Sequence, residues 1–333
     1  MRLAVLLSIL VPVTLLGETI QVTPDHYYRT FAHGNPVLKS IKSGDIVITK
    51  TLDSGGQNYR GEQSSPSGNP LTGPFSVDGA LPGDALVVKL RKVRLNRNWG
   101  YTAYRLGLFS VTPESIETIY PNHYKSGLVR KDRDNILPWD IDLEHQTVHL
   151  REPVSSKIKL AFPVRPMLGC IGVAAPGDFA PTSGPSGSYG GNLDYNEIGE
   201  GATVILPVYH PGGLLFMGDG HALMADGEPT GTGVETSMDV EFSVTVMKNA
   251  HVTGPRVETD EYLISMGAQP EFASSLDRAL QMATTDMVRW LVADYQLEPW
   301  AAHQLIGAVG KYDVVTVAGS MALKVPRKYL PVK

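Results

Sequence analysis

The sequence is poor in cysteine, with Cys170 as the only one among 333 residues. A single thiol excludes an internal disulfide, so the fold depends on its hydrophobic core alone. Cys170 lies in the apolar stretch MLGCIGVAAPG. That setting is typical of a buried, unreactive thiol rather than of a catalytic nucleophile.

The sequence also lacks an excess of basic residues. Lys and Arg number 29 against 34 Asp and Glu, which gives a formal net charge of −5, and no basic cluster stands out. Nucleic acid and anionic membrane surfaces are therefore disfavoured as partners. The hydrophobic fraction of 42% and the charged fraction of 19% are typical of a globular protein.

The apolar run at the N-terminus is too short for a membrane span, which needs about twenty residues. After Arg2, the uncharged run extends only over Leu3–Gly17. This pattern predicts a secretory signal peptide over residues 1–17, and hence a periplasmic or secreted protein with no stable membrane insertion after cleavage. Leu15 is larger than the residue that cleavage sites favour there, so an uncleaved N-terminal anchor is the alternative.

Short apolar runs bounded by Gly, Pro, Asn or Asp dominate residues 35–250. In MDVEFSVTVM, the apolar residues Val240, Phe242 and Val244 alternate with polar ones, as in a half-buried strand. Many short strands with frequent turn signals predict a mainly β protein with a sandwich or barrel-like core.

The pattern changes to helical spacing after about residue 270. Leu276, Leu280, Ala283, Met287 and Leu291 recur on one helical face. Ser274 or Ser275 can cap this helix, and a second helix is expected to begin at Pro299. We therefore expect one domain over residues 18–333, with a β core to about 270 and a helical hairpin and closing strands over 271–333.

Several familiar catalytic signatures are missing: the zincin helix, the serine nucleophile elbow, the phosphate loop and the dinucleotide fingerprint. What stands out instead is GDGHALMADGEPTGTGVE, residues 218–235. Asp219 and His221 share one face of an extended strand, and Asp226 and Glu228 repeat that spacing before Glu235. Imidazole with carboxylates suits Zn²⁺, an all-oxygen set suits Ca²⁺, and a solvated turn-rich hairpin would look similar.

Two further segments carry candidate polar residues. In SYGGNLDYNEIGEG, Asn192 and Asp194 also have the spacing that places two side chains on one face, and they could present an amide and a carboxylate to a ligand. In TLDSGG, Asp53 ends a predicted strand, where a carboxylate can serve as a distant metal ligand. For both segments, turn residues that bond the backbone are the alternative.

The chain resembles the acetamidase/formamidase family over nearly its whole length after the signal segment. The motifs that carry the resemblance are NPLTGPFSVDGALPGDALVVKL, MLGCIGVAAPG, GGNLDYNEIGEGATVILPV, GGLLFMGDGHALMADGEPTGTGVE and YDVVTVAGSMALKVPRKYL. The resemblance implies a β-sandwich with an added helical portion. It also implies hydrolysis of short aliphatic amides to carboxylate and ammonia, with a bound divalent metal in some members.

The resemblance implies eight site positions in this chain, and we infer their roles from the chemistry of the side chains. The expected metal ligands are Asp53, His221, Asp226 and Glu235. Asp219 and Glu228 are expected to transfer protons, and Asn192 and Asp194 to bind the substrate. The expected metal is Zn²⁺, with Ca²⁺ as the alternative.

The chain departs from the family pattern at Asn69, where a histidine is common, and at Met224 and Ala225, where Gln and Gly are usual. These positions bear on the identity of the amide. An exported small-molecule binding module with a structural cation and no turnover is the alternative function, and a serine hydrolase without metal is a third. A homo-oligomer is expected from the prevalence of such assemblies.

Overall fold

The computed structural model describes residues 17–103, 110–112, 114–115, 136–153, 155–268 and 275–332. All but the last residue of the predicted signal peptide lies outside the described residues, as does Ser274. Among the residues described, no helix is both long and apolar enough to cross a membrane.

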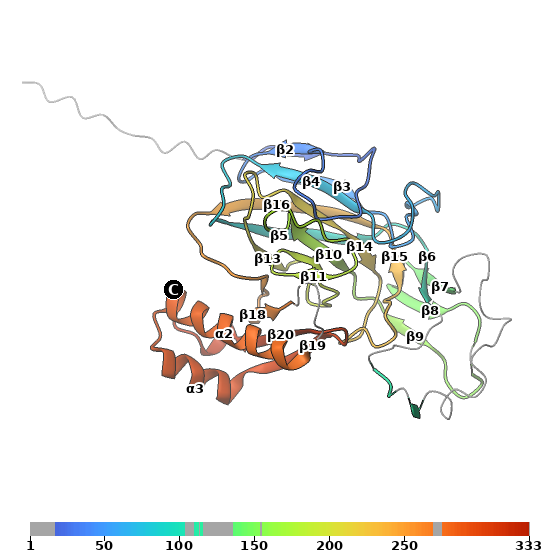
Figure 1. The fold of residues 1–333 in the computed structure, drawn as a ribbon. Helices are drawn as coiled ribbons and strands as arrows, with labels where there is room; N and C mark the ends of the chain where they lie inside the picture. The colour runs from blue at the N-terminus through green and yellow to red at the C-terminus, as the bar shows by residue number, and fades with distance from the viewer. Residues whose placement is uncertain are drawn as a thin grey trace, which may run out of the picture.

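The described chain forms two large sheets (Figure 1). The first sheet has nine strands, in the spatial order β1 (Thr19–Gln21), β3 (Ile46–Lys50), β16 (Met238–Met247), β5 (Ala85–Leu95), β13 (Thr203–Pro207), β17 (Arg256–Glu258), β18 (Tyr262–Gly267), β20 (Ser320–Pro326) and β19 (Lys311–Thr316).

The second sheet has eleven strands. Nine follow the order β11 (Ser186–Gly187), β12 (Gly190–Asn192), β10 (Met167–Val173), β14 (Leu215–His221), β15 (Glu235–Thr236), β6 (Trp99–Ala103), β7 (Ile136–Asp142), β8 (Thr147–Leu150) and β9 (Ala161–Pro163). The other two branch from β14: β4 (Leu71–Val77) pairs with it, and β2 (Lys39–Ile41) pairs with β4.

The main core lies between the two sheets and makes the protein a sandwich. Alternate residues of each strand point inward, so β16 contributes Val240, Phe242 and Val244, all buried. Phe242 meets Phe75 of β4 edge to face, with ring centroids 5.3 Å apart. The sandwich expected from the strand pattern is confirmed.

The outer face of the nine-stranded sheet is covered at one end by two helices, α2 (Leu276–Tyr295) and α3 (Pro299–Val309), which lie beside β18, β19 and β20 (Figure 1). Ser275 caps α2 by accepting a hydrogen bond from the N–H of Arg278 at 3.2 Å, and Pro299 begins α3. A short 3-10 helix (Arg327–Tyr329) follows β20.

The two predicted helices are present at the expected positions, but two residues expected on the buried face of the first helix are partly exposed. Ala283, Met287 and Leu291 pack under α2 as expected, with Trp290 beside them. Leu276 and Leu280, however, are each 37% exposed. The first turns of α2 therefore present apolar residues that the sheet does not cover.

Candidate functional site

Strand pairing brings His221 and Glu235 together. His221 ends β14 and Glu235 begins β15, and the two residues are register partners in this antiparallel pair. Directly opposite residues share one face of a sheet, so the imidazole and the carboxylate meet. Nε2 of His221 lies 3.1 Å from Oε1 of Glu235 and 3.7 Å from Oδ1 of Asp219. All three side chains are buried.

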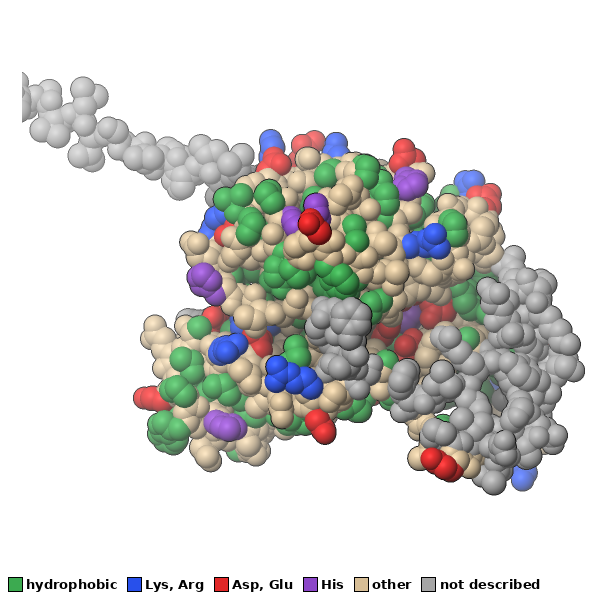
Figure 2. Space-filling view, in the orientation of Figure 1, with side chains coloured by type: hydrophobic (Ala, Val, Ile, Leu, Met, Phe, Trp, Pro, Cys, Tyr) green, Lys and Arg blue, Asp and Glu red, His purple; other side chains and the backbone are tan. Residues whose placement is uncertain are grey.

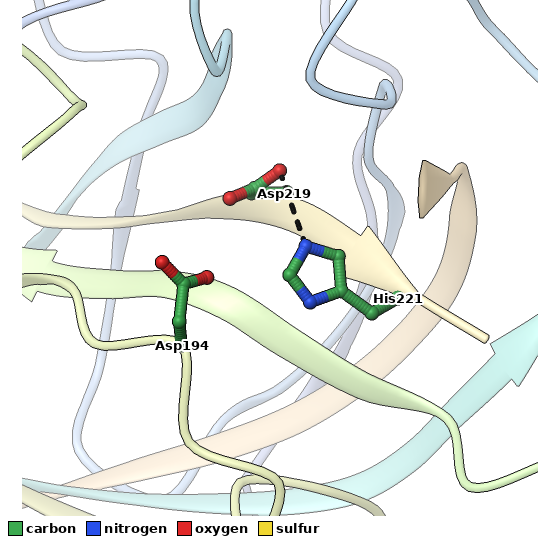
Figure 3. Close-up of side chains that lie close together, drawn as sticks. All are labelled: Asp194, Asp219 and His221. Atoms are coloured by element: carbon green, nitrogen blue, oxygen red, sulfur yellow. Dashed lines mark ion pairs between the residues drawn. The ribbon is translucent and has the colours of Figure 1, made fainter. Parts of the chain in front are cut away.

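Asp194 approaches the same point from the loop after β12 (Figure 3). Its carboxylate, that of Asp219 and the His221 imidazole point toward a common space, and each offers a ligand atom within 4.8 Å of the others. Glu228 forms a second such set with His221 and Glu235. His221 therefore joins the two sets into one cluster of four carboxylates and one imidazole.

The backbone is unusual at the residues that build this cluster. Asp194, Asp219 and Glu228 all have left-handed backbone, with φ of 43°, 56° and 45°. Such conformations are uncommon outside glycine and collect at functional sites. Asp219 has this conformation inside strand β14.

Unsatisfied buried polar atoms are concentrated here. Among the described residues, the fully buried side-chain atoms without a hydrogen-bond partner include Oδ1 of Asp194, Oδ1 of Asp219, both ring nitrogens of His221 and Oε2 of Glu235. The 3.1 Å contact between His221 and Glu235 lacks hydrogen-bond geometry. An unpartnered buried polar atom costs about 1–3 kcal/mol, so five in one cluster require a missing partner.

The pKa values of the cluster residues also indicate that a positively charged partner would stabilise the cluster. Burial, together with the carboxylates of Glu228 and Asp219, raises the pKa of Asp194 well above its ordinary value. Burial also raises the pKa of Glu235 to about 8. Burial opposes a charge on His221, but Glu235 and Asp219 outweigh it and hold the pKa of the imidazole well above normal. Ionising all four carboxyls would place more negative charge here than one imidazolium can balance, and a bound cation would favour their ionised form.

Two glycines leave room for the cluster. A methyl group added at Gly169 of β10 would lie 2.5 Å from Oδ1 of Asp194 and 2.8 Å from Oδ2 of Asp219. One added at Gly233 would lie 2.7 Å from Nδ1 of His221. Any larger residue at either position would occupy the space that the unpartnered atoms face.

Two predicted metal ligands lie away from the cluster. Oδ2 of Asp53 is 2.6 Å from Nη2 of Arg97, and its Oδ1 accepts a hydrogen bond from the N–H of Gln57 at 2.8 Å. Asp226 is exposed, and its Oδ1 accepts a bond from Nδ2 of Asn196 at 2.6 Å. Other groups hold these carboxylates, and neither belongs to the two ligand sets of the described residues.

The two residues expected to bind substrate take different places. Asp194 belongs to the ligand cluster. Asn192 is half-buried beside it, and its side-chain amide donates to Oδ2 of Asp194. Its Oδ1 is 2.9 Å from Sγ of Cys170, which is buried as expected and whose pKa burial raises well above normal.

Sequence reasoning missed the contacts that surround the cluster. Asn69 donates from Nδ2 to Oδ2 of Asp219 at 3.0 Å, although 150 positions separate them. Asn69 precedes β4 with a φ of 51°. The sequence marked Asn69 only as a departure from the family pattern, and nothing in local spacing indicated its partner.

One depression on the surface of the described residues does not include this cluster. A depression of about 980 Å³ is lined by charged residues, among them Arg94, Glu200, Arg165 and Glu197, and the five cluster residues are not part of its lining. Its charges are paired, with Arg94 3.1 Å from Glu200 and Arg165 2.9 Å from Glu197. Figure 2 shows acidic and histidine side chains in a hollow right of centre. The unpartnered buried atoms identify the candidate site.

Comparison with known proteins gives a consistent result. A model of the acetamidase/formamidase family matches residues 173–277, which include all five cluster residues. A crystal structure of an acetamidase from Yersinia enterocolitica is 27% identical, with a TM-score of 0.76 over 95% of this chain and 94% of its own. A predicted acetamidase/formamidase from Thermoanaerobacter tengcongensis is 30% identical, with a TM-score of 0.73 over 94% and 97%.

A curated formamidase from Methylophilus methylotrophus is 25% identical over 258 residues, or 64% of this chain. The match spans 62% of the length of the curated relatives. The similarity therefore covers 94–95% of this chain in the two solved structures and about 62% of the length of the curated relatives.

Proposed function

The chain belongs to the acetamidase/formamidase family, and from that premise we propose that it hydrolyses the C–N bond of a short aliphatic amide. The products are a carboxylate and ammonia, and water supplies the added oxygen. The cluster of Asp194, Asp219, His221, Glu228 and Glu235 is the proposed catalytic centre.

The observation that carries the proposal is the set of unpartnered buried atoms on four of these five residues. Imidazole nitrogen combined with carboxylate oxygens fits Zn²⁺, whereas Ca²⁺ takes six to eight oxygen ligands. We infer that Asp194, Asp219 and His221 hold a zinc ion, with Glu235 against the imidazole. A zinc ion bound there would acidify water and polarise the amide carbonyl.

The protein's own groups then have to move protons. Glu228 is the only half-buried member of the cluster, on the loop between β14 and β15, and the other four are buried. We assign to it the removal of a proton from the attacking water and its delivery to the departing nitrogen. General acid–base catalysis of this kind contributes about 10²–10⁴-fold to the rate. Glu235 lies against the ring of His221, with Oε1 3.1 Å from Nε2.

Removing the metal and removing the proton carrier test the two parts separately. Purified protein is analysed for metal, treated with chelator and assayed for ammonia release from formamide, acetamide and larger amides. We expect activity to disappear with the metal and to return with Zn²⁺. Glu228→Gln should bind zinc and lose about 10²–10⁴-fold in kcat, whereas Glu144→Gln, on an exposed turn, should behave like the wild type.

Other outcomes would favour the other functions. A loss of stability on chelation, without turnover of any amide, would indicate a binding module with a structural cation. Turnover that is indifferent to chelator would indicate a hydrolase with a serine nucleophile. Full activity of zinc-loaded Glu228→Gln would remove that residue from proton transfer.

We also propose where the protein is located and how its subunits assemble. We propose export of the chain through the N-terminal segment, because Arg2 precedes the apolar run Leu3–Gly17. We propose a homo-oligomer because symmetric assemblies are common among soluble proteins. Fractionation of cells expressing the full chain and light scattering of the purified protein test these points.

A further inference from the structure

We propose that Asn69 and Asn192 are positioning residues that each hold one oxygen of a cluster carboxylate, so that the other oxygen stays directed at the cation. The inference rests on the proposed metal site and assigns the two amides a role different from substrate binding. The supporting observations are the hydrogen bonds that the two amides donate to Asp194 and Asp219.

The two carboxylates are held in the same way. Nδ2 of Asn69 donates to Oδ2 of Asp219 at 3.0 Å, and Nδ2 of Asn192 donates to Oδ2 of Asp194. In both carboxylates the other oxygen, Oδ1, is buried and has no hydrogen-bond partner among the described residues. Each amide therefore fixes the rotation of a carboxylate and leaves one oxygen for a ligand.

The orientation of both amides follows from their other contacts. Oδ1 of Asn192 faces two donors, Nδ2 of Asn69 at 3.2 Å and Sγ of Cys170 at 2.9 Å. The donating end of Asn192 must therefore face Asp194. Nδ2 of Asn69 is surrounded by acceptors, including the carbonyl oxygen of Ser183 at 3.4 Å. Rotating either amide by 180° would place its oxygen against a carboxylate oxygen.

The two amides form one linked unit with the thiol. Asn69 bonds both Asp219 and Asn192, and Asn192 in turn bonds Asp194. These hydrogen bonds join segments that lie far apart in the sequence, so the network exists only in the folded protein. Partners behind metal ligands fix their orientation, and mutating such partners costs about 10–100-fold in metal affinity or activity.

The test is a zinc titration of the metal-free protein in competition with a chromophoric chelator. Asn69 has a φ of 51°, so Asn69→Gly removes the amide without straining the backbone. Asn192→Ala removes the other amide. We expect each variant to bind zinc about 10–100-fold more weakly than the wild type, with metal-free melting temperatures reported alongside.

The matched control is Asn196→Ala. Nδ2 of Asn196 donates to Oδ1 of Asp226 at 2.6 Å, which is the same bond between the same residue types outside the cluster. We expect this variant to retain wild-type zinc affinity. Cys170→Ser keeps a donor toward Asn192 and should retain affinity better than Cys170→Ala, which removes it.

The steady-state parameters separate positioning from substrate binding. At saturating zinc, we expect positioning residues to leave KM unchanged, because their amides bond the carboxylates and not the substrate. If Asn192→Ala raises KM while zinc affinity stays at the wild-type level, Asn192 binds substrate and the inference is overturned. Wild-type affinity in both amide variants would also overturn it. If the wild type itself binds no zinc, the proposed metal site fails and the inference falls with it.

Discussion

Gly169→Ala is the substitution that tests the geometry of the cluster most directly. The added methyl group would lie 2.5 Å from Oδ1 of Asp194, 2.8 Å from Oδ2 of Asp219 and 3.0 Å from the carbonyl oxygen of Asp219. An ordinary contact begins at 3.4 Å, so Oδ1 of Asp194 would have to move by about 0.9 Å. The backbone of Gly169 does not have a positive φ, so alanine adds no conformational strain.

The magnitude follows from that displacement. A misplacement of about 1 Å in a catalytic constellation can cost roughly 10²-fold in rate. Overpacking a buried position typically costs about 1–3 kcal/mol of stability. We therefore expect Gly169→Ala to fold, to melt a few degrees lower, and to lose about two orders of magnitude in turnover together with a comparable part of its zinc affinity.

The assays are calorimetric melting, competitive zinc titration and ammonia release. Gly307→Ala is the control, because a methyl group there meets no atom within 4 Å on helix α3. Alanine is favoured over glycine in a helix by about 1 kcal/mol, so the control should be active and slightly more stable. A Gly169→Ala protein with normal zinc affinity and turnover would refute the placement of the site between Asp194 and Asp219.

Further predictions concern charges outside the cluster. Arg97→Ala should lower the free energy of unfolding in urea by about 3–5 kcal/mol, because it leaves Asp53 buried and unpaired. Asp53→Asn should retain wild-type zinc affinity, and a loss of zinc would restore Asp53 as a ligand. The Nζ of Lys248 and the N–H of Leu81 bond Asp84 and lower its pKa from 3.8 to about 2, so its stabilisation is present above 3.8 and lost as pH falls toward 2. Urea unfolding from pH 5 to 2 should therefore show a smaller acid-induced loss of stability for Asp84→Asn than for the wild type, and equal losses would contradict this assignment.

Much of the fold could be predicted because it depends on local periodicity. Alternation at Val240, Phe242 and Val244 places these side chains on one face of a strand wherever that strand packs. Helical spacing likewise identified α2, with Ser275 as its cap. It could not show that Leu276 and Leu280 would be partly exposed, because periodicity gives the apolar face of a helix and not the turns that another layer covers.

The hairpin that carries Asp219, His221 and Glu235 was visible in sequence for the same reason. Residues two apart on a strand are expected to share a face, and residues 222–234 connect this strand to the one that begins at Glu235. Equal spacing could not separate Glu228 from Asp226. Glu228 joins the cluster through a left-handed backbone, whereas Asp226 is exposed and is bonded by Asn196.

The sequence by itself determined the class of fold, the helical addition and a hairpin with one imidazole between acidic residues. Only the tertiary structure decided which acids are available to a ligand. Arg97 neutralises Asp53 from 44 positions away, and Asn69 holds one oxygen of Asp219 from 150 positions away. Burial and hydrogen-bond satisfaction depend on contacts between distant segments. For that reason the unpartnered oxygens that identify the site have no local signature in the sequence.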